Sequence, residues 1–447
     1  MKKLMMKPQN ARNSRMSARA DVPTRQGSGL AIATREFTCT STLVNGEDAP
    51  GVHYPSAIAC GPTTSAKGKD GGAEFDLLVV DASNRLYLID KLGVCRKTIG
   101  EPGTAPGCFL NAKGLAVSED GQFVYVADTG NDRIQRFRIH DSLLMAIAGG
   151  KPRLGMTPKS CGLQSLDGGA MLPKRYALES LAQPHGLALH GDKLFVADTW
   201  NHRVVVLNTA LTTNFAGLGR ATSEEVPVIP EMQALSYWGS KGCGPPDRDG
   251  RPFFQFPKGI AVAPGEDGEV VVADTRNHRL QLFTQDGRYT RGLSGGVGDS
   301  TTRASPGRMS GTELFSFPSD VCVSASGHHI FVSDQRAIIV LRFAELQPIC
   351  TLARASPSRA FIARRATQSS AALCVHPATA SDAKRFTAEH NRKMEPHSLA
   401  LYVAEYDEHS LRELVLSSAD LRSPKEPAKR NVLERPAHVP VRVIGGR

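Results

Sequence analysis

The chain has 447 residues, of which 40% are hydrophobic and 22% are charged, and it carries nine cysteines. No apolar run approaches the roughly 20 residues of a transmembrane helix, and the first residues lack the apolar stretch of a secretory signal. The cysteines are scattered without a Cys-x-x-Cys pair, which argues against a zinc ribbon or a disulfide framework. We therefore expect a protein without a membrane segment, with reduced thiols, in an intracellular compartment.

The net charge of +10 is concentrated outside the body of the chain. Residues 1–36 hold eight Lys/Arg and two acids, and residues 342–372 hold five against one, whereas residues 37–341 hold 29 against 31. We interpret residues 1–36 as a disordered basic tail of a cytoplasmic protein. A mitochondrial presequence has the same composition, so both interpretations stay open.

A short apolar run that ends in an acid recurs along the chain. The copies are Phe123–Asp128, Leu194–Asp198, Val270–Asp274 and Ile330–Asp334, and more loosely Leu77–Asp81 and Leu401–Glu405. An internal repeat of this length fixes the architecture of a whole chain.

Each copy extends on both sides in the same way. Upstream stands a Pro-x-Gly-apolar segment and a short turn, and downstream stands Asp-Thr-x-Asn-x-Arg, an alternating strand and a run that ends in Gly, as in Asn214–Gly217. The unit thus contains four short strands with turn residues between them and no helical period. Such a unit, repeated around a ring, predicts the four-stranded blades of a β-propeller.

These motifs closely resemble NHL repeats, with the strongest match in blades two to four. The resemblance covers about residues 50–417 and implies an all-β fold with six blades and long insertions between them. We expect one propeller over residues 37–447, with blades near 50–100, 107–150, 181–219, 253–298, 314–353 and 373–446. Either Pro440–Gly446 or Phe37–Gly46 should supply the last strand of the ring.

The positions that the three full motif copies share have sound structural roles. The Asp can accept backbone N–H groups of the next turn, the Asn tolerates a left-handed conformation, and the Arg can pair with the Asp. We assign this role to Asp128, Asn131, Arg133, Asp198, Asn201, Arg203, Asp274, Asn277 and Arg279.

The positions that vary between copies are the candidates for binding. Trp200 and Arg276 occupy the tip of the loop between the second and third strands, and either ligand binding or packing on a neighbouring loop would explain them. Lys113, His185 and Lys258 begin consecutive inner strands, so they should line one mouth of the central channel. We hypothesise contact with an anion or acidic peptide there; ordinary solvated lysines are the alternative.

Four long segments, 151–180, 219–252, 299–313 and 351–372, follow outer strands and should lie on the same face as the loop tips. Long loops on a rigid scaffold are common binding sites. We therefore predict a monomeric, non-catalytic scaffold that binds protein partners through this face, with no metal or cofactor. The alternative is single-stranded RNA binding by a basic face, which the near-neutral body does not favour. No RING pattern of Cys and His is present.

A metal-dependent lyase or hydrolase in the channel is a third alternative. Peptide-amidating lyases are similar propellers that hold zinc through channel histidines, and Gln183–Ala188 looks like one such site, with His185 as the ligand. His397 has a similar local sequence, but it precedes what we interpret as a second strand, outside the channel. A catalytic zinc usually needs three protein ligands, and the equivalent positions in other blades are Lys or Ser. No nucleophile elbow or phosphate loop is present.

Overall fold

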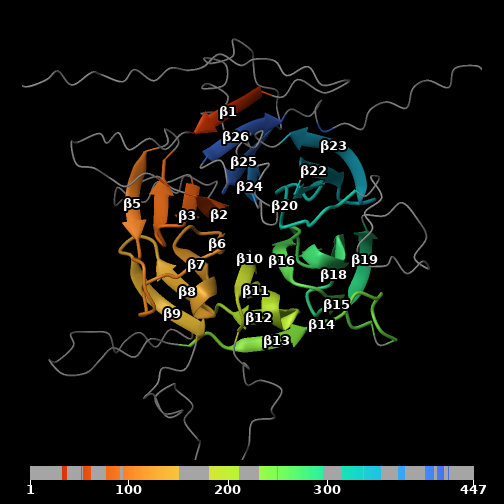
Figure 1. Ribbon diagram of the computed structural model, residues 1–447, viewed down its shortest axis with the longest axis horizontal. Coiled ribbons are helices and arrows are strands. Elements are labelled where there is room, and N and C mark those ends of the chain that lie inside the picture. The colour runs from red at the N-terminus through yellow and green to blue at the C-terminus, as the bar shows by residue number, and fades with distance from the viewer. Residues whose placement is uncertain are drawn as a thin grey trace, which may run out of the picture.

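The computed structural model describes residues 33–37, 52, 54–61, 77–90, 94–150, 181–210, 231–248, 250–294, 314–335, 337–353, 371–377, 398–406, 410–416 and 421. In these residues the chain forms a ring of six four-stranded antiparallel sheets, which confirms the predicted six-bladed propeller (Figure 1). A seventh, two-stranded sheet joins β14 (Ser240–Lys241) to β15 (Phe253–Phe254). None of the described residues forms a helix long and apolar enough to cross a bilayer.

The blades follow one another in chain order, and each runs from an inner strand at the channel to an outer strand. Blade one contains β2 (Pro55–Cys60), β3 (Leu77–Asp81), β4 (Leu86–Ile89) and β5 (Cys95–Ile99). Blade two contains β6 (Gly114–Val117), β7 (Phe123–Asp128), β8 (Arg133–Arg138) and β9 (Leu143–Gly149). Blade three contains β10 (Pro184–His190), β11 (Lys193–Asp198), β12 (Arg203–Asn208) and β13 (Ala234–Trp238). Blade four contains β16 (Pro257–Val262), β17 (Val270–Asp274), β18 (Arg279–Phe283) and β19 (Tyr289–Ser294). Blade five contains β20 (Asp320–Val323), β21 (His329–Ser333), β22 (Ala337–Arg342) and β23 (Gln347–Ala353). Blade six contains β24 (Ala371–Pro377), β25 (Leu399–Glu405), β26 (Ser410–Leu416) and β1 (Ala33–Phe37).

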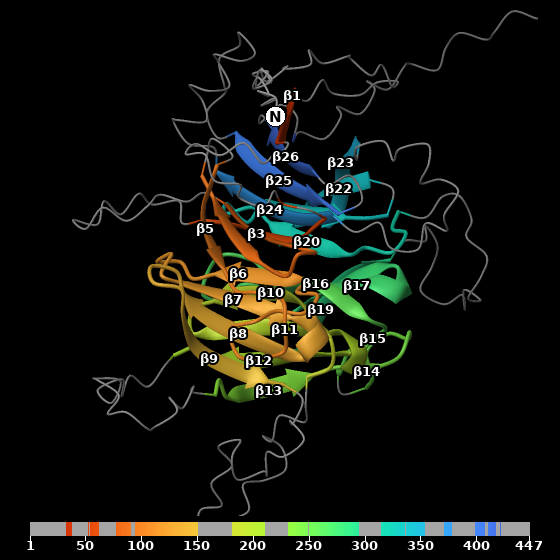
Figure 2. The same cartoon turned by 60° about the vertical axis from the view of Figure 1, so that its left-hand side comes forward.

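The middle of each second strand is a continuous apolar run because the neighbouring blades cover both of its faces. Every residue of β17, for example, is buried. One hydrophobic cluster joins Tyr125 of blade two to Leu194 of blade three, and another joins Phe195 of blade three to Val270 of blade four. The core therefore lies between blades, which Figure 2 shows as sheets stacked side by side.

The ring is closed by the N-terminal part of the chain, at a place that neither predicted segment matches. β1 pairs antiparallel with β26, with Ala33 opposite Val415 and Phe37 opposite Leu411. The predicted boundary of the tail at residue 36 is thus too late, because the strand begins at Ala33. Residues 38–46 and 440–446 lie outside the described residues. An outer strand needs only backbone partners along one edge, so Thr34-Arg35-Glu36 can serve without an apolar pattern.

The outer strand of blade three also differs from the prediction. It is Ala234–Trp238, inside the predicted insertion 219–252, whereas the predicted strand at 214–217 lies outside the described residues. Trp238 packs against Phe254 and Phe283, with ring centroids 6.0 and 4.8 Å away. This part of the insertion is therefore built into the core between blades three and four.

The two ends of the channel differ in what surrounds them. One end carries the loops between second and third strands, including the 3-10 turns η1 (Thr129–Asn131), η3 (Thr199–Asn201) and η5 (Thr275–Asn277). The loops that precede the inner strands lie beside them, because the turn N–H groups of Gly130, Trp200 and Arg276 donate to carbonyls of Leu110, Ala182 and Gln255. We call this end the loop face and the opposite end, with its tight hairpin turns, the turn face.

We expect that deleting residues 1–37 lowers the melting temperature by about 5 °C or more, because β26 would lose its partner and become an exposed edge. A deletion of residues 1–30, which keeps β1, is the matched control and should melt like the full chain. Differential scanning calorimetry measures both. Equal melting temperatures for the two deletions would contradict closure of the ring by β1.

Candidate binding site at the channel mouth

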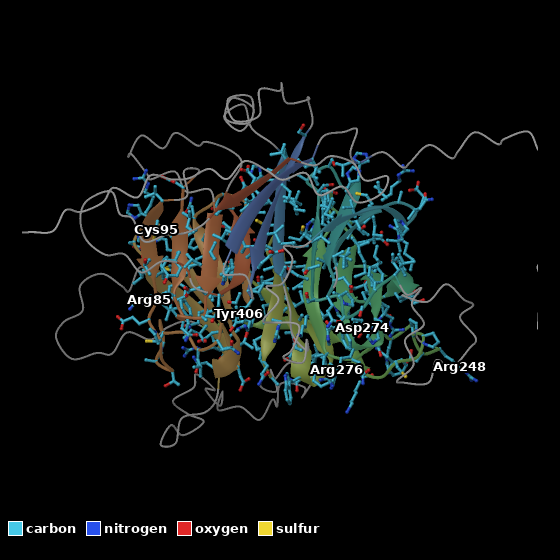
Figure 3. All side chains as sticks on the ribbon, turned by 45° about the horizontal axis from the view of Figure 1, so that its top comes forward. Arg85, Cys95, Arg248, Asp274, Arg276 and Tyr406 are labelled. Atoms are coloured by element: carbon cyan, nitrogen blue, oxygen red, sulfur yellow. The ribbon has the colours of Figure 1, made fainter. Side chains whose placement is uncertain are left out.

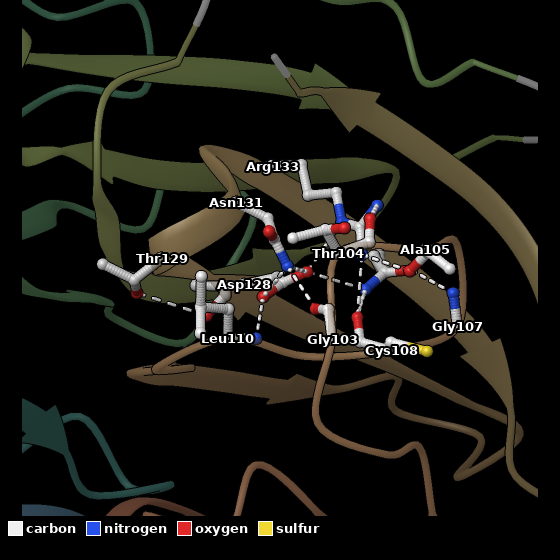
Figure 4. Close-up of polar contacts among 12 residues, drawn as sticks. Gly103, Thr104, Ala105, Gly107, Cys108, Leu110, Asp128, Thr129, Asn131 and Arg133 are labelled. Carbon is white, nitrogen blue, oxygen red and sulfur yellow. Dashed lines mark hydrogen bonds and ion pairs between the residues drawn. The ribbon is translucent and has the colours of Figure 1, made fainter. Parts of the chain in front are cut away.

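A buried carboxylate organises the loops of the loop face in blades two, three and four. In blade two, Asp128 accepts hydrogen bonds from the Leu110 backbone N–H at 2.7 Å, from Asn131 Nδ2 at 2.8 Å and from Arg133 Nε at 2.6 Å (Figure 4). The Arg133 guanidinium also donates to the carbonyls of Thr104, Ala105 and Cys108. One carboxylate thus fixes the 3-10 turn and the loop that precedes the inner strand.

Blades three and four repeat this arrangement. Asp198 accepts from the Ala182 N–H, Asn201 and Arg203, and Asp274 accepts from the Gln255 N–H, Asn277 and Arg279, all at 2.7–2.8 Å. Burial raises the pKa of Asp128, Asp198 and Asp274, and the hydrogen bonds and the Arg charges oppose that shift. In each of these blades the shared Asp, Asn and Arg side chains therefore hydrogen-bond to one another, and their role is structural.

A second variable position of the motif, which the sequence analysis left unassigned, joins neighbouring blades. Asp132 Oδ1 accepts from the Gln183 N–H at 2.8 Å, His202 Nδ1 from the Phe256 N–H at 3.0 Å, and His278 Nδ1 from the Phe317 N–H at 3.2 Å. Each pair links one blade to the next. Burial lowers the pKa of His202, which favours the neutral imidazole that can accept at Nδ1. Only the repeated spacing, compared between successive blades, could have pointed to this link.

The residue before the entry Pro of blades four and five, whose N–H makes this hydrogen bond, lies in the left-handed region, with φ of +53° at Phe256 and +66° at Phe317. This conformation places aromatic rings beside the loop tips. The Phe256 ring lies 5.7 Å from the Trp200 ring and 4.4 Å from the Arg276 guanidinium. The Trp200 side chain is 56% exposed. Trp200 and Arg276, both predicted binding residues, therefore share one aromatic neighbour on the loop face.

The three predicted mouth residues, Lys113, His185 and Lys258, come together because the inner strands approach closely at the repeat glycines. A Cβ on Gly114 would lie 1.9 Å from the His185 carbonyl oxygen, and a Cβ on Gly186 would lie 2.3 Å from the Lys258 carbonyl oxygen. A larger residue at Gly114 or Gly186 would therefore collide with the backbone of the next blade, directly at its mouth residue. The other residues at this position differ: the Ser56 hydroxyl donates to the Ala112 carbonyl and the Ser319 hydroxyl to the Ser333 carbonyl.

The electrostatics of the mouth reflect partial burial and mutual repulsion. Burial and then the Lys258 charge lower the pKa of Lys113 to about 8. Burial, Lys258 and Lys113 lower the pKa of His185 to about 3, so this imidazole is neutral at physiological pH. Burial and the Arg276 charge lower the pKa of Lys258. The mouth therefore carries clustered positive charge with a neutral imidazole among the cations.

Aromatic rings from blade six and the loop before blade one border this cluster. Lys113 Nζ lies 4.7 Å from the centre of the Tyr406 ring, which is 5.3 Å from the Tyr54 ring. Tyr406 and Arg276 lie on the same lower side of the ribbon in Figure 3. The mouth can therefore offer cationic and aromatic contacts together. Among the described residues, no three His, Cys, Asp or Glu side chains form a metal-binding group, and His397 lies outside them.

The match to a known family coincides with the blades that carry these loops. The NHL repeat family model matches residues 109–137, 181–207 and 254–283, in blades two, three and four. The chain thus carries NHL repeats in three blades of a six-bladed propeller. It is 24% identical over 220 residues to NHL repeat-containing protein 2 of Gallus gallus, an alignment that covers 46% of this chain and 28% of that protein. The chain thus matches less than a third of that relative's length.

Among solved structures, this chain is similar to virginiamycin B lyase from Staphylococcus aureus, with 11% identity and a TM-score of 0.41. That comparison covers 86% of this chain and all of the lyase chain.

One inner-strand position departs from the repeat. Asp320 of blade five stands where blades two to four have Gly114, Gly186 and Gly259. Its carboxylate accepts the backbone N–H of Leu373, in blade six, at 2.8 Å and that of Val321 at 2.9 Å. Burial raises the pKa of Asp320 to about 7, against those two hydrogen bonds. Asp320 therefore links blades five and six at some electrostatic cost.

We expect Asp274→Ala to cost about 3–5 kcal/mol of unfolding free energy, because it leaves the Arg279 guanidinium without its buried carboxylate. Arg276→Ala, two residues away, should cost at most about 1 kcal/mol, since it removes only a contact with the Phe256 ring. Urea unfolding of the two variants measures the difference. Similar losses in both would refute the division between structural and variable positions.

Asp320 should make the protein less stable as the pH rises. Its pKa is higher in the folded state, about 7, than its ordinary value of 3.8. The stability that protonation contributes is therefore fully present below about pH 4 and is lost as the pH rises to about 7. Relative to Asp320→Asn, the native protein should lose on the order of a few kcal/mol across this range. Urea unfolding at pH 4 to 8 that gave parallel curves would show that the carboxyl titrates normally.

Proposed function

We propose that this NHL-repeat propeller is a non-catalytic scaffold whose loop face binds an acidic segment of a partner protein. The observation that carries the proposal is the cluster of Lys113, His185 and Lys258 at the channel mouth. No carboxylate pairs with any of the three in the part of the chain that the structure describes.

The physical argument rests on the lowered pKa of both lysines. Holding two ammonium groups near each other in a partly buried mouth weakens each charged form. A carboxylate that entered the mouth would interact with the ammonium groups in place of water and would offset their mutual repulsion. Binding of the carboxylate should therefore raise the pKa of the lysines, and protonated lysines should bind the carboxylate more tightly. Neutral His185 would add a hydrogen-bond donor or acceptor between them.

Exposed and half-buried aromatic side chains around the mouth supply the apolar part of such a site. Trp200 and Phe256 stand on one side, Phe317 on the next blade, and Tyr54 with Tyr406 across the ring. Trp, Tyr and Arg are the residues that most often dominate the energy of protein interfaces. A partner segment that alternates acidic and aromatic or aliphatic residues fits this combination. NHL propellers commonly mediate protein interactions, which supports a protein partner.

A non-catalytic role is part of the proposal. The acids that recur in blades two to four are occupied by structural hydrogen bonds, so they are poorly placed to act as general bases. Single-stranded RNA is the other ligand to be tested, because the exposed Trp200 ring offers a face on which a base could stack, with the Arg276 guanidinium near the same Phe256 ring. The small number of mouth cations favours the peptide, since phosphate binding gains from extended positive charge.

The test measures binding of a fluorescein-labelled peptide with four Glu-Tyr-Glu repeats by fluorescence anisotropy. Lys113→Glu with Lys258→Glu should weaken binding at least tenfold, since two attractive charges become repulsive. The matched control is Lys97→Glu with Lys193→Glu. It makes the same charge change where Lys97 Nζ donates to the Ile139 and His140 carbonyls and Lys193 Nζ to Gln285.

Equal weakening by both double variants would show a nonspecific charge effect and refute a mouth site. A uridine-rich oligonucleotide is measured alongside. If it bound more tightly than the peptide, with affinity falling steeply as salt rises, the RNA alternative would replace the proposal. Purification of partners from cells with and without ribonuclease then identifies the natural ligand.

A further inference from the structure

Three cysteines from three neighbouring inner strands meet in the channel wall. Cys60 ends β2 of blade one, Cys374 lies in β24 of blade six, and Cys322 lies in β20 of blade five. The sulfur atoms of Cys60 and Cys374 are 2.7 Å apart. Cys374 is buried, whereas Cys60 and Cys322 keep partial exposure. Cys60, Cys322 and Cys374 are free thiols.

The Cys60–Cys374 contact lies at the seam of the ring, where its first blade meets its last. The two residues are separated by 314 positions in the chain. Blades one and six pack through one hydrophobic cluster that contains Ile58, Tyr402 and Cys374. The chain runs from β1, the outer strand of blade six, to β2, the inner strand of blade one, so this seam is also where the ring is closed.

We propose that Cys60 and Cys374 form a reversible disulfide that locks the first blade of the propeller to the last. The oxidant is a small disulfide such as oxidised glutathione. The Cys60 thiolate attacks one sulfur of that disulfide, forms a mixed disulfide and releases one glutathione thiolate. The Cys374 thiolate then attacks Cys60 Sγ, forms the protein disulfide and releases the second glutathione thiolate. The two protein thiols lose two protons and two electrons, and the oxidant becomes two thiols.

The order of the two steps follows from the surroundings of the sulfurs. Cys60 is the partly exposed member of the pair, so it can meet an oxidant first. Burial raises the pKa of Cys374 well above its ordinary value, and neighbouring Cys60, Cys322 and Asp320 add to the shift. Cys374 is thus a poor first nucleophile, but it lies in contact with the sulfur that it must attack. Burial also raises the pKa of Cys322.

A bond at this position would constrain almost the whole propeller. It would close a loop that contains blades two to five, and long loops lose the most chain entropy on unfolding when they are cross-linked. We therefore expect the oxidised protein to melt roughly 5–10 °C above the reduced protein. The mouth residues of the loop face are not part of the bond, so this inference is independent of the proposed ligand.

The experiment uses the purified full chain, incubated with oxidised glutathione or with dithiothreitol. Mass spectrometry of non-reduced peptides should find Cys60 joined to Cys374 only in the oxidised sample, and calorimetry should show the higher melting temperature. Cys60→Ser and Cys374→Ser should each abolish the redox-dependent shift. The controls Cys322→Ser and Cys243→Ser should keep it, because Cys243 is exposed and lies in the segment between β14 and β15.

Two results would overturn the proposal. One is a native protein in which Cys243 reacts with glutathione while Cys60 and Cys374 stay free. The other is a disulfide that maps to a different pair, such as Cys60 with Cys322. Both results are measured on the protein without substitutions, so they decide the question even if a serine variant fails to fold.

Discussion

The loop face depends on one interaction, the buried carboxylate that ends the second strand of a blade. In blades two to four this group collects the N–H of the loop before the inner strand, the Asn amide of the 3-10 turn and the Arg guanidinium. A carboxylate without these partners would be costly to bury. With them, it holds two loops in one conformation, and the side chains between the shared residues project from a rigid base.

This arrangement divides the repeat into two sets of positions. The shared residues contact one another, so exchanging any of them affects folding first. The variable residues are free to differ between blades, and here they supply Trp200, Arg276 and the lysines of the mouth. A third set became apparent only in three dimensions: Asp132, His202 and His278 accept hydrogen bonds from the next blade. The face is thus stabilised within blades by the acids and between blades by these side chains.

The sequence predicted the blades well because their second strands are buried on both faces and read as continuous apolar runs. It failed at two outer strands. β1 is polar and lacks the Gly-ended apolar run on which the prediction relied, and in blade three an earlier run of that kind, Asn214–Gly217, was chosen in place of Ala234–Trp238. The closeness of Lys113, His185 and Lys258 followed from the repeat alone. The aromatic neighbours Phe256 and Tyr406 did not, because their positions depend on a left-handed residue and on the blade across the ring.

The central claim is that ligands engage the loop face and not the turn face. Hydrogen–deuterium exchange of the protein with and without a bound partner tests it most directly, because it reports on both faces in one measurement. We predict protection at residues 110–114, 183–187, 199–203, 255–259 and 275–279, with turns 118–123, 190–193 and 264–268 unchanged. Protection confined to those turns, with the loop face unchanged, would contradict the account.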